Sequence, residues 1–73
     1  MIYYKIDVLA ELKKKGYTVY RLQKESLLGN STITKLNGCK GKRADGEGAL
    51  SMKNLNKICS LLHCQPGDIL QFR

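Results

Sequence analysis

The sequence predicts an all-α domain of four to five short helices, and three observations support this fold class. Apolar residues recur every three or four positions in several stretches, which is the spacing of one helix face. No stretch alternates apolar and polar residues as a half-buried strand would. The length of 73 residues suits a single domain over 1–73 with a modest core, and is too short for two-domain enzymes or barrels.

The first helix is predicted over residues 3–15. Ile6, Leu9 and Leu12 fall on one apolar stripe at helical spacing. The segment closes with three lysines before Gly16, and cations in the last turn with a glycine beyond them are typical of a helix C-terminus.

Two shorter helices are predicted next. Thr18 is a favourable N-cap for a helix that ends at about Ser26. A third helix covers about residues 30–37, with Ile33 and Leu36 as its apolar anchors. Because eight residues with so narrow an apolar stripe are unstable alone, packing must hold this helix. Its other side chains are polar or basic and include no acid, which is typical of a surface that contacts a polar partner.

A glycine-rich stretch, residues 37–48, separates these helices from the rest. Its four glycines disfavour both helix and strand, and Lys40, Lys42 and Arg43 cluster near its start. We expect this stretch to be mobile in the free protein and to become ordered when its cations meet an anionic partner.

The C-terminal part carries the clearest amphipathic pattern. Ser51 is the predicted N-cap of a fourth helix that ends at about Leu62, and Pro66 suits the first position of a last helical turn. The predicted core consists of Leu9, Leu22, Ile33, Leu36, Leu55, Ile58 and Leu62, closed by Ile69, Leu70 and Phe72.

The charge of the chain is one-sided. The formal net charge is +7, and residues 1–43 hold ten Lys and Arg against three Asp and Glu, whereas residues 44–73 hold three of each sign. Nucleic acid is the commonest partner of such a basic surface. The alternative is a solubility charge spread over solvated helices.

The three cysteines predict free thiols rather than a disulfide framework. Their number is odd, no export signal is apparent at the N-terminus, and no run approaches the roughly 18 apolar residues that span a bilayer. These features predict a cytoplasmic protein with no membrane partner. Cys59, His63 and Cys64 are zinc-ligand types without a fourth ligand, so we expect no metal and no cofactor, and Cys59 is expected to be a core thiol.

No catalytic residues are predicted, and the chain is not expected to be an enzyme. Residues 41–46 have glycine spacing like a phosphate loop but lack the Lys-Ser/Thr that follows one. His63 adjoins no nucleophile, and Asp45 and Glu47 lie on an irregular stretch that would not fix the spacing of an acid/base pair.

Residues 18–38 place two short helices a few residues apart, the second of them polar. This is the helix-turn-helix arrangement, in which the second helix enters the major groove of DNA. The residues that carry a family pattern are Leu22, Leu28, Ile33, Thr34, Leu36, Asn37, Gly38, Ser51, Leu55, Ile58, Cys59, Leu62 and the tail from Cys64 to Leu70. On these residues the sequence resembles the phage repressor/Cro-like helix-turn-helix family, specifically a small single-domain branch with a lambda-repressor-like five-helix fold.

Four positions depart from the pattern of that family. Gln23 stands where the family usually has Ala, Leu27 where it has Gly at the turn, and Gly29 where it has a Ser or Thr cap. Many members also begin the second helix with a phosphate-binding Gln, where this chain has Val19. These differences indicate a divergent member with a shifted turn.

The resemblance implies a set of DNA contacts. Its base-contacting positions correspond to Asn30, Ser31 and Lys35, whose side chains suit base edges. Its phosphate contacts fall on Thr18, Thr32, Thr34, Asn37, Lys40, Lys42 and Arg43. For two of these residues a simpler role stays open, since Thr34 can bond to its own backbone and Lys35 can be a solvated charge.

The function that the resemblance implies is a sequence-specific, double-stranded DNA-binding transcriptional regulator, a repressor of phage or mobile-element type. One such module contacts few base pairs, so a homodimer on a palindromic operator is expected. The alternative is a protein-interaction module on the same fold, an antitoxin or anti-repressor with weak or no DNA binding; an RNA binder is a further one. The charge distribution favours nucleic acid, whereas Val19 favours the interaction module.

Overall fold

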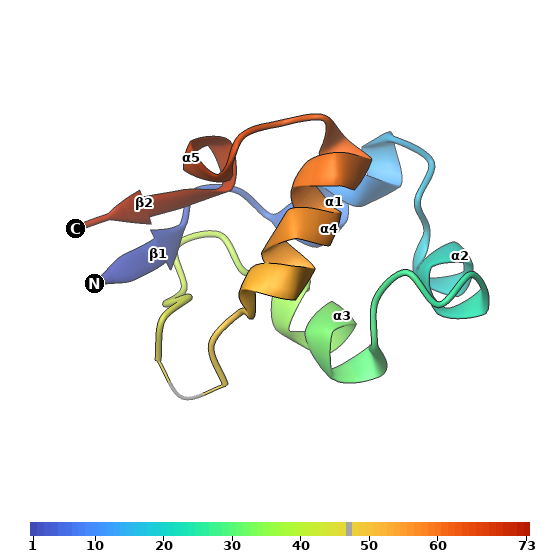
Figure 1. Cartoon of the computed structure of the whole chain (residues 1–73), viewed down its shortest axis with the longest axis horizontal. Coiled ribbons are helices and arrows are strands. Elements are labelled where there is room, and N and C mark those ends of the chain that lie inside the picture. Colours follow the sequence, from blue (N-terminus) through green and yellow to red (C-terminus); the bar gives the residue numbers. More distant parts are fainter. Residues whose placement is uncertain (47) are drawn as a thin grey trace.

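The computed structural model describes residues 1–46 and 48–73. Along the chain the elements are β1 (Ile2–Tyr4), α1 (Val8–Lys14), α2 (Val19–Lys24), α3 (Asn30–Leu36), α4 (Met52–Leu62), α5 (Pro66–Ile69) and β2 (Leu70–Phe72). The helices surround one core, and the two strands lie side by side at the end of the molecule that holds both termini (Figure 1).

The predicted helices α2 to α5 are confirmed, together with their caps. The hydroxyl of Thr18 accepts a hydrogen bond from the Arg21 N–H (3.2 Å), and that of Ser51 accepts one from the Asn54 N–H (3.1 Å). Pro66 is the first residue of α5, where its missing N–H costs nothing.

Within the described residues five helices are present, as predicted, but the first is confirmed only over Val8–Lys14 of the predicted 3–15, and the strictly all-α fold is wrong because a two-stranded sheet is also present. Helix α1 begins only at Val8, because Asp7 caps it by accepting a hydrogen bond from the Ala10 N–H (3.3 Å). The preceding strand β1 pairs antiparallel with β2, Tyr3 lying opposite Gln71. The two strands are residues 2–4 and 70–72, so no local sequence pattern could predict that they pair.

The glycine-rich stretch also differs from expectation, because its first part is hydrogen-bonded along the free side of β1. The Tyr4 N–H donates to the Lys42 carbonyl (2.9 Å), the Gly41 N–H to the Tyr4 carbonyl (2.8 Å), and the Ala44 N–H to the Ile2 carbonyl (2.8 Å). Ala44 is itself buried. Strand β1 is thus flanked on both sides, and the backbone of residues 41–44 is held rather than loose.

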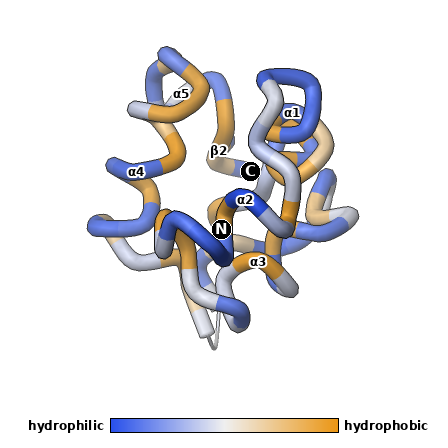
Figure 2. The backbone as a smooth tube through the Cα atoms, turned by 90° about the vertical axis from the view of Figure 1, so that its right-hand side faces the viewer, coloured by the Kyte–Doolittle hydropathy of each residue, from blue (hydrophilic) through white to orange (hydrophobic). Residues whose placement is uncertain are grey.

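All seven central core residues of the prediction are buried. In Figure 2 the hydrophobic positions of α4 face the rest of the molecule and its hydrophilic positions lie on the outer side. The expectation for Phe72 is wrong: its side chain is 79% exposed, whereas Leu70 is half-buried and Ile69 fully buried. Strand β2 runs outward past the core, so its last residues leave the apolar interior.

The three cysteines are free. Cys39 is buried, and its Sγ donates to the Ile6 carbonyl (3.4 Å) and accepts from the Val8 N–H (3.5 Å). Burial raises the pKa of this thiol, which keeps it protonated and unreactive. Cys59 packs against the core but is only half-buried, so the core thiol of this domain is Cys39.

Candidate nucleic-acid interface

The turn between α2 and α3 is built around Ser26 and Leu28. Ser26 has a left-handed backbone (φ 53°), and Leu28 is buried in the core. Leu27, which stands where a turn glycine was expected, needs no positive φ because the residue before it supplies the left-handed conformation. Gly29 then caps α3 in an extended conformation without a side-chain hydrogen bond.

The inner face of α3 is anchored by apolar packing and one polar contact. Ile33 and Leu36 are buried in the core. Thr32 is only 8% exposed, and its Oγ1 accepts a hydrogen bond from Nδ2 of Asn54 on α4 (3.1 Å). Thr32, expected from the sequence to contact phosphate, is therefore a packing residue whose hydroxyl faces α4.

The outer face of α3 presents Asn30, Ser31, Thr34 and Lys35, all of them exposed, and Asn37 is exposed just beyond its end. The Thr34 hydroxyl donates its only proton to the Asn30 carbonyl (2.9 Å). In the free protein this proton is used within the helix, which favours the simpler role for Thr34, a bond to its own backbone. Thr18 differs, because its hydroxyl accepts when it caps α2 and keeps a proton to donate.

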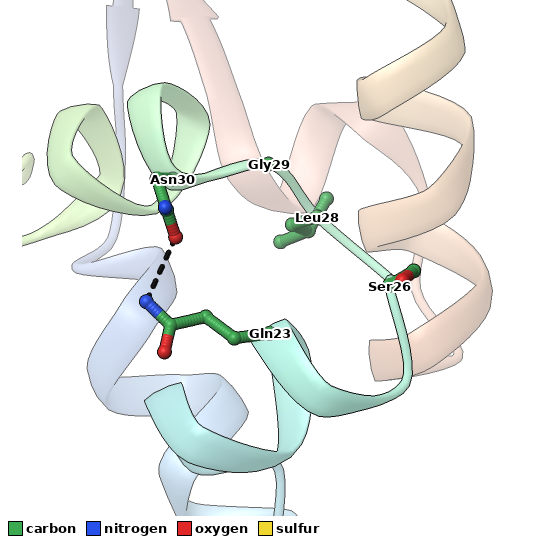
Figure 3. Close-up of a pocket in the computed structure, with 5 residues that line it drawn as sticks. All are labelled: Gln23, Ser26, Leu28, Gly29 and Asn30. Atoms are coloured by element: carbon green, nitrogen blue, oxygen red, sulfur yellow. Dashed lines mark hydrogen bonds between the residues drawn. The ribbon is translucent and has the colours of Figure 1, made fainter.

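Asn30, the first residue of α3, is tied to α2 by its side chain. Its Oδ1 accepts a hydrogen bond from Nε2 of Gln23 (2.8 Å), and the two amides point toward each other across an open, polar pocket (Figure 3). Lys35 lies on the other half of the helix, and it lines a second shallow pocket with Lys42 and Arg43. Three cations from α3 and the stretch after it thus surround one hollow.

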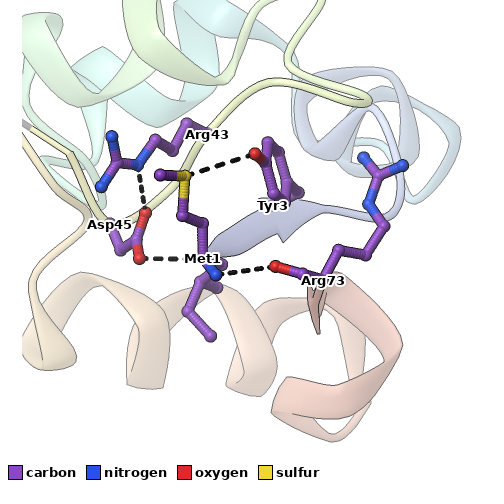
Figure 4. Close-up of polar contacts among 6 residues, drawn as sticks. Met1, Tyr3, Arg43, Asp45 and Arg73 are labelled. Carbon is purple, nitrogen blue, oxygen red and sulfur yellow. Dashed lines mark hydrogen bonds and ion pairs between the residues drawn. The ribbon is translucent and has the colours of Figure 1, made fainter.

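Arg43 is held in place from the side of β1. Its Nε donates to Oδ1 of Asp45 (2.7 Å), and Oδ2 of Asp45 accepts the N–H of Ile2 (3.0 Å; Figure 4). The Arg43 guanidinium chiefly, and then the Ile2 N–H, hold the pKa of Asp45 below its usual range. Because this bond uses Nε, the two terminal nitrogens of Arg43 stay available to an anion.

The family model of the Cro/C1-type HTH DNA-binding domain matches residues 5–73. The chain belongs to this family. Its helix-turn-helix is therefore formed by α2 and α3, and the protein is a DNA-binding regulator. Neither the comparison with curated proteins nor the comparison with solved structures gave a match.

The Cro/C1-type family is typically non-enzymatic. In residues 1–46 and 48–73, no helix is long and apolar enough to cross a membrane. Within the same ranges, no three His, Cys, Asp or Glu side chains come together as a metal site would require.

Three contacts of this Cro/C1-type domain escaped sequence reasoning: Gln23 with Asn30, Asn54 with Thr32, and Asp45 with Arg43. The first joins neighbouring helices of the helix-turn-helix, and its signal was the polar Gln23 at a position where the family has Ala. The second joins residues 22 positions apart and has no local signal. Asp45 was visible as an acid beside basic residues, but its bond to Ile2 depends on the position of β1.

Proposed function

We propose that this Cro/C1-type domain is a sequence-specific transcriptional repressor of phage or mobile-element type that occupies a double-stranded DNA operator. The observation that carries the proposal is the outer face of α3. It is polar, free of acids and held rigidly by Ile33 and Leu36 underneath. A rigid polar helix face at the second position of a helix-turn-helix is suited to base edges in the major groove.

In this proposal Asn30, Ser31 and Lys35 contact bases. Asn suits the adenine edge, Lys the acceptors of guanine, and Ser accepts either. All three side chains are exposed on α3. Lys35 also lines the same pocket as Lys42 and Arg43. Its contact with a base would therefore lie close to the proposed phosphate contacts of those two residues.

The proposed phosphate contacts are Thr18, Asn37, Lys40, Lys42 and Arg43, all exposed. Phosphate oxygens only accept hydrogen bonds, and each of these side chains has a proton to donate. The backbone of Lys42 and Arg43 is paired with β1, which fixes the positions from which these two side chains extend. Thr34 is omitted because its proton is used within α3.

The active form in this proposal is a homodimer on a two-fold symmetric site, since one module contacts too few base pairs for specificity. We place the dimer surface on α4 and the segment from Pro66 to Arg73. Met52 and Phe72, at 78% and 79% exposure, are the large apolar side chains that these elements leave uncovered. Replacing both by Ser should lower the dimer fraction in sedimentation measurements.

Selection of bound sites from random duplex DNA tests the function directly. We expect a short palindromic consensus, and we expect single-stranded DNA and RNA of the same sequence to compete weakly. Recovery of no consensus at physiological salt would contradict sequence-specific binding. That result would favour the alternative of a protein-interaction module.

A further inference from the structure

We propose that Gln23 is a positioning residue for base selection: its side chain holds the Asn30 side chain in one place before DNA binds. This inference rests on the proposed sequence-specific function and deepens it. It assigns a role to a residue on α2, outside the recognition helix. The observation that supports it is the hydrogen bond between the Gln23 and Asn30 side-chain amides.

The contact joins two exposed side chains on different helices. Nε2 of Gln23 lies 2.8 Å from Oδ1 of Asn30, although the residues are seven positions apart and separated by the turn. Both belong to the rim of one open pocket, with Ser26, Leu28 and Gly29 between them (Figure 3). The pocket opens to solvent beside the first turn of α3, where a recognition helix presents base-reading side chains.

The backbone beneath the contact is rigid. Leu22, adjacent to Gln23, is fully buried, and Leu28, two residues before Asn30, is 4% exposed. The two helices therefore cannot drift apart without opening the core. The amide pair consequently restrains the Asn30 side chain and not the helices, which are already fixed.

The bond leaves Asn30 able to bind a base. Of the two lone pairs of its Oδ1, one accepts from Gln23 and the other stays free, and both protons of Nδ2 stay free. The acceptor-and-donor pattern that suits the adenine edge is thus preserved. An unrestrained Asn can turn its amide over and offer the opposite pattern. Gln23 offers both a donor and an acceptor, so the two bonded amides can turn over only together, and the bond keeps the Asn30 amide in one place. A Glu at position 23 would offer acceptors only and would require the reversed Asn30 amide.

The test compares base preference for five proteins: wild type, Gln23→Ala, Gln23→Glu, Asn30→Ala and the double variant Gln23→Ala/Asn30→Ala. Affinities are measured on the selected wild-type site and on duplexes substituted at each base pair. Lys24→Ala is the matched control, since Lys24 is an exposed neighbour on α2 outside the amide pair. It should weaken binding by the same factor on every duplex.

We expect Gln23→Ala to reduce discrimination at the base pair read by Asn30 by about 2- to 12-fold, the cost of immobilising one free side chain. Preference at other base pairs should be unchanged. In the Asn30→Ala background the same change should have no further effect on preference. Gln23→Glu offers only acceptors, so it should favour the reversed Asn30 amide and shift preference away from the wild-type base.

Each contrary outcome is distinct. Absence of any wild-type consensus would refute the proposed function itself. A wild-type consensus that Gln23→Ala retains in full would refute the positioning role. A loss that persists in the Asn30→Ala background would mean that Gln23 touches DNA independently. Uniform weakening with a lowered melting temperature would mean that Gln23 only stabilises the fold.

Discussion

At the scale of single residues, hydrogen bonds between side chains position several residues of the candidate interface. Gln23 holds Asn30, Asn54 holds Thr32, and Asp45 holds Arg43. Charge-assisted bonds such as the last are the stronger kind, although exposure to water reduces what they add to stability. Helical spacing predicted the outward-facing Asn30, Ser31, Thr34 and Lys35 of α3, but it did not predict that Thr32 is buried. The hydrogen-bond partners were not predictable, because each partner is set by how two elements cross in space.

Ser26 gives the first prediction at this scale. Its left-handed φ of 53° costs a non-glycine residue about 1–2 kcal/mol in the folded state. A glycine avoids that cost but loses about 0.5–1 kcal/mol of stability, because it has more conformational freedom in the unfolded chain. Ser26→Gly should therefore raise the free energy of unfolding by about 0.5–1 kcal/mol, measured by urea titration. Ser60→Gly, in the last turn of α4, is the control and should lower it by about 0.5 kcal/mol. Destabilisation by both changes would refute this account of the turn.

Asp45 gives a prediction about how the free energy of unfolding depends on pH. Its folded pKa is lowered, chiefly by Arg43 and then by the Ile2 N–H, so its contribution to stability is present above the ordinary carboxyl pKa of about 3.9. That contribution is lost as the pH falls through the lower, folded value. Asp45→Asn should be less stable than wild type at neutral pH, and the two unfolding free energies should converge under acid. A difference that stays constant from pH 7 to pH 2 would contradict this.

At the scale of elements, the helices follow local signals and the strands do not. Helices α2 and α4 begin at Thr18 and Ser51 caps and carry their apolar residues at helical spacing, so the sequence alone predicts them. Strand β1 is Ile-Tyr-Tyr, a composition that favours strands, but three residues are too few to establish alternation. Its pairing with β2 and with residues 41–44 exists only after the chain ends meet.

The paired backbone beside β1 predicts the exchange behaviour of the glycine-rich stretch. The amides of Gly41, Lys42 and Ala44 donate to backbone carbonyls in the free protein. Hydrogen exchange should therefore show protection at these three amides without DNA, and little added protection when DNA binds. The amide of Lys40, for which the described residues show no acceptor, serves as the internal comparison and should exchange faster. Fast exchange at all four would mean that the pairing is not maintained in solution.

At the scale of the whole molecule, the charge is uneven between the first 43 residues and the rest of the chain. The molecule measures 34 × 23 × 20 Å, with both termini and the strands at one end and α2 at the other (Figure 1). The ten basic residues of positions 1–43 include every cation of α1, α2 and α3, whereas residues 44–73 are balanced in charge. We therefore expect a duplex to be attracted to the part formed by residues 1–43, and a second copy of this cationic chain to be repelled least by the charge-balanced C-terminal part.

In the proposed function, side chains of α3 contact bases while the segment after α3 contacts the phosphates of the DNA. The most direct measurement is the affinity of wild type, Asn30→Ala and Lys42→Ala for the selected site and its single-base variants, at several salt concentrations. Lys42→Ala should weaken binding to every duplex alike and reduce the slope of log affinity against log salt by about 0.9. Asn30→Ala should leave that slope unchanged and remove about 1–3 kcal/mol of preference at one base pair in each half-site. Equal weakening of every duplex by both variants, with no base preference lost, would contradict the assignment of α3 as the reading helix.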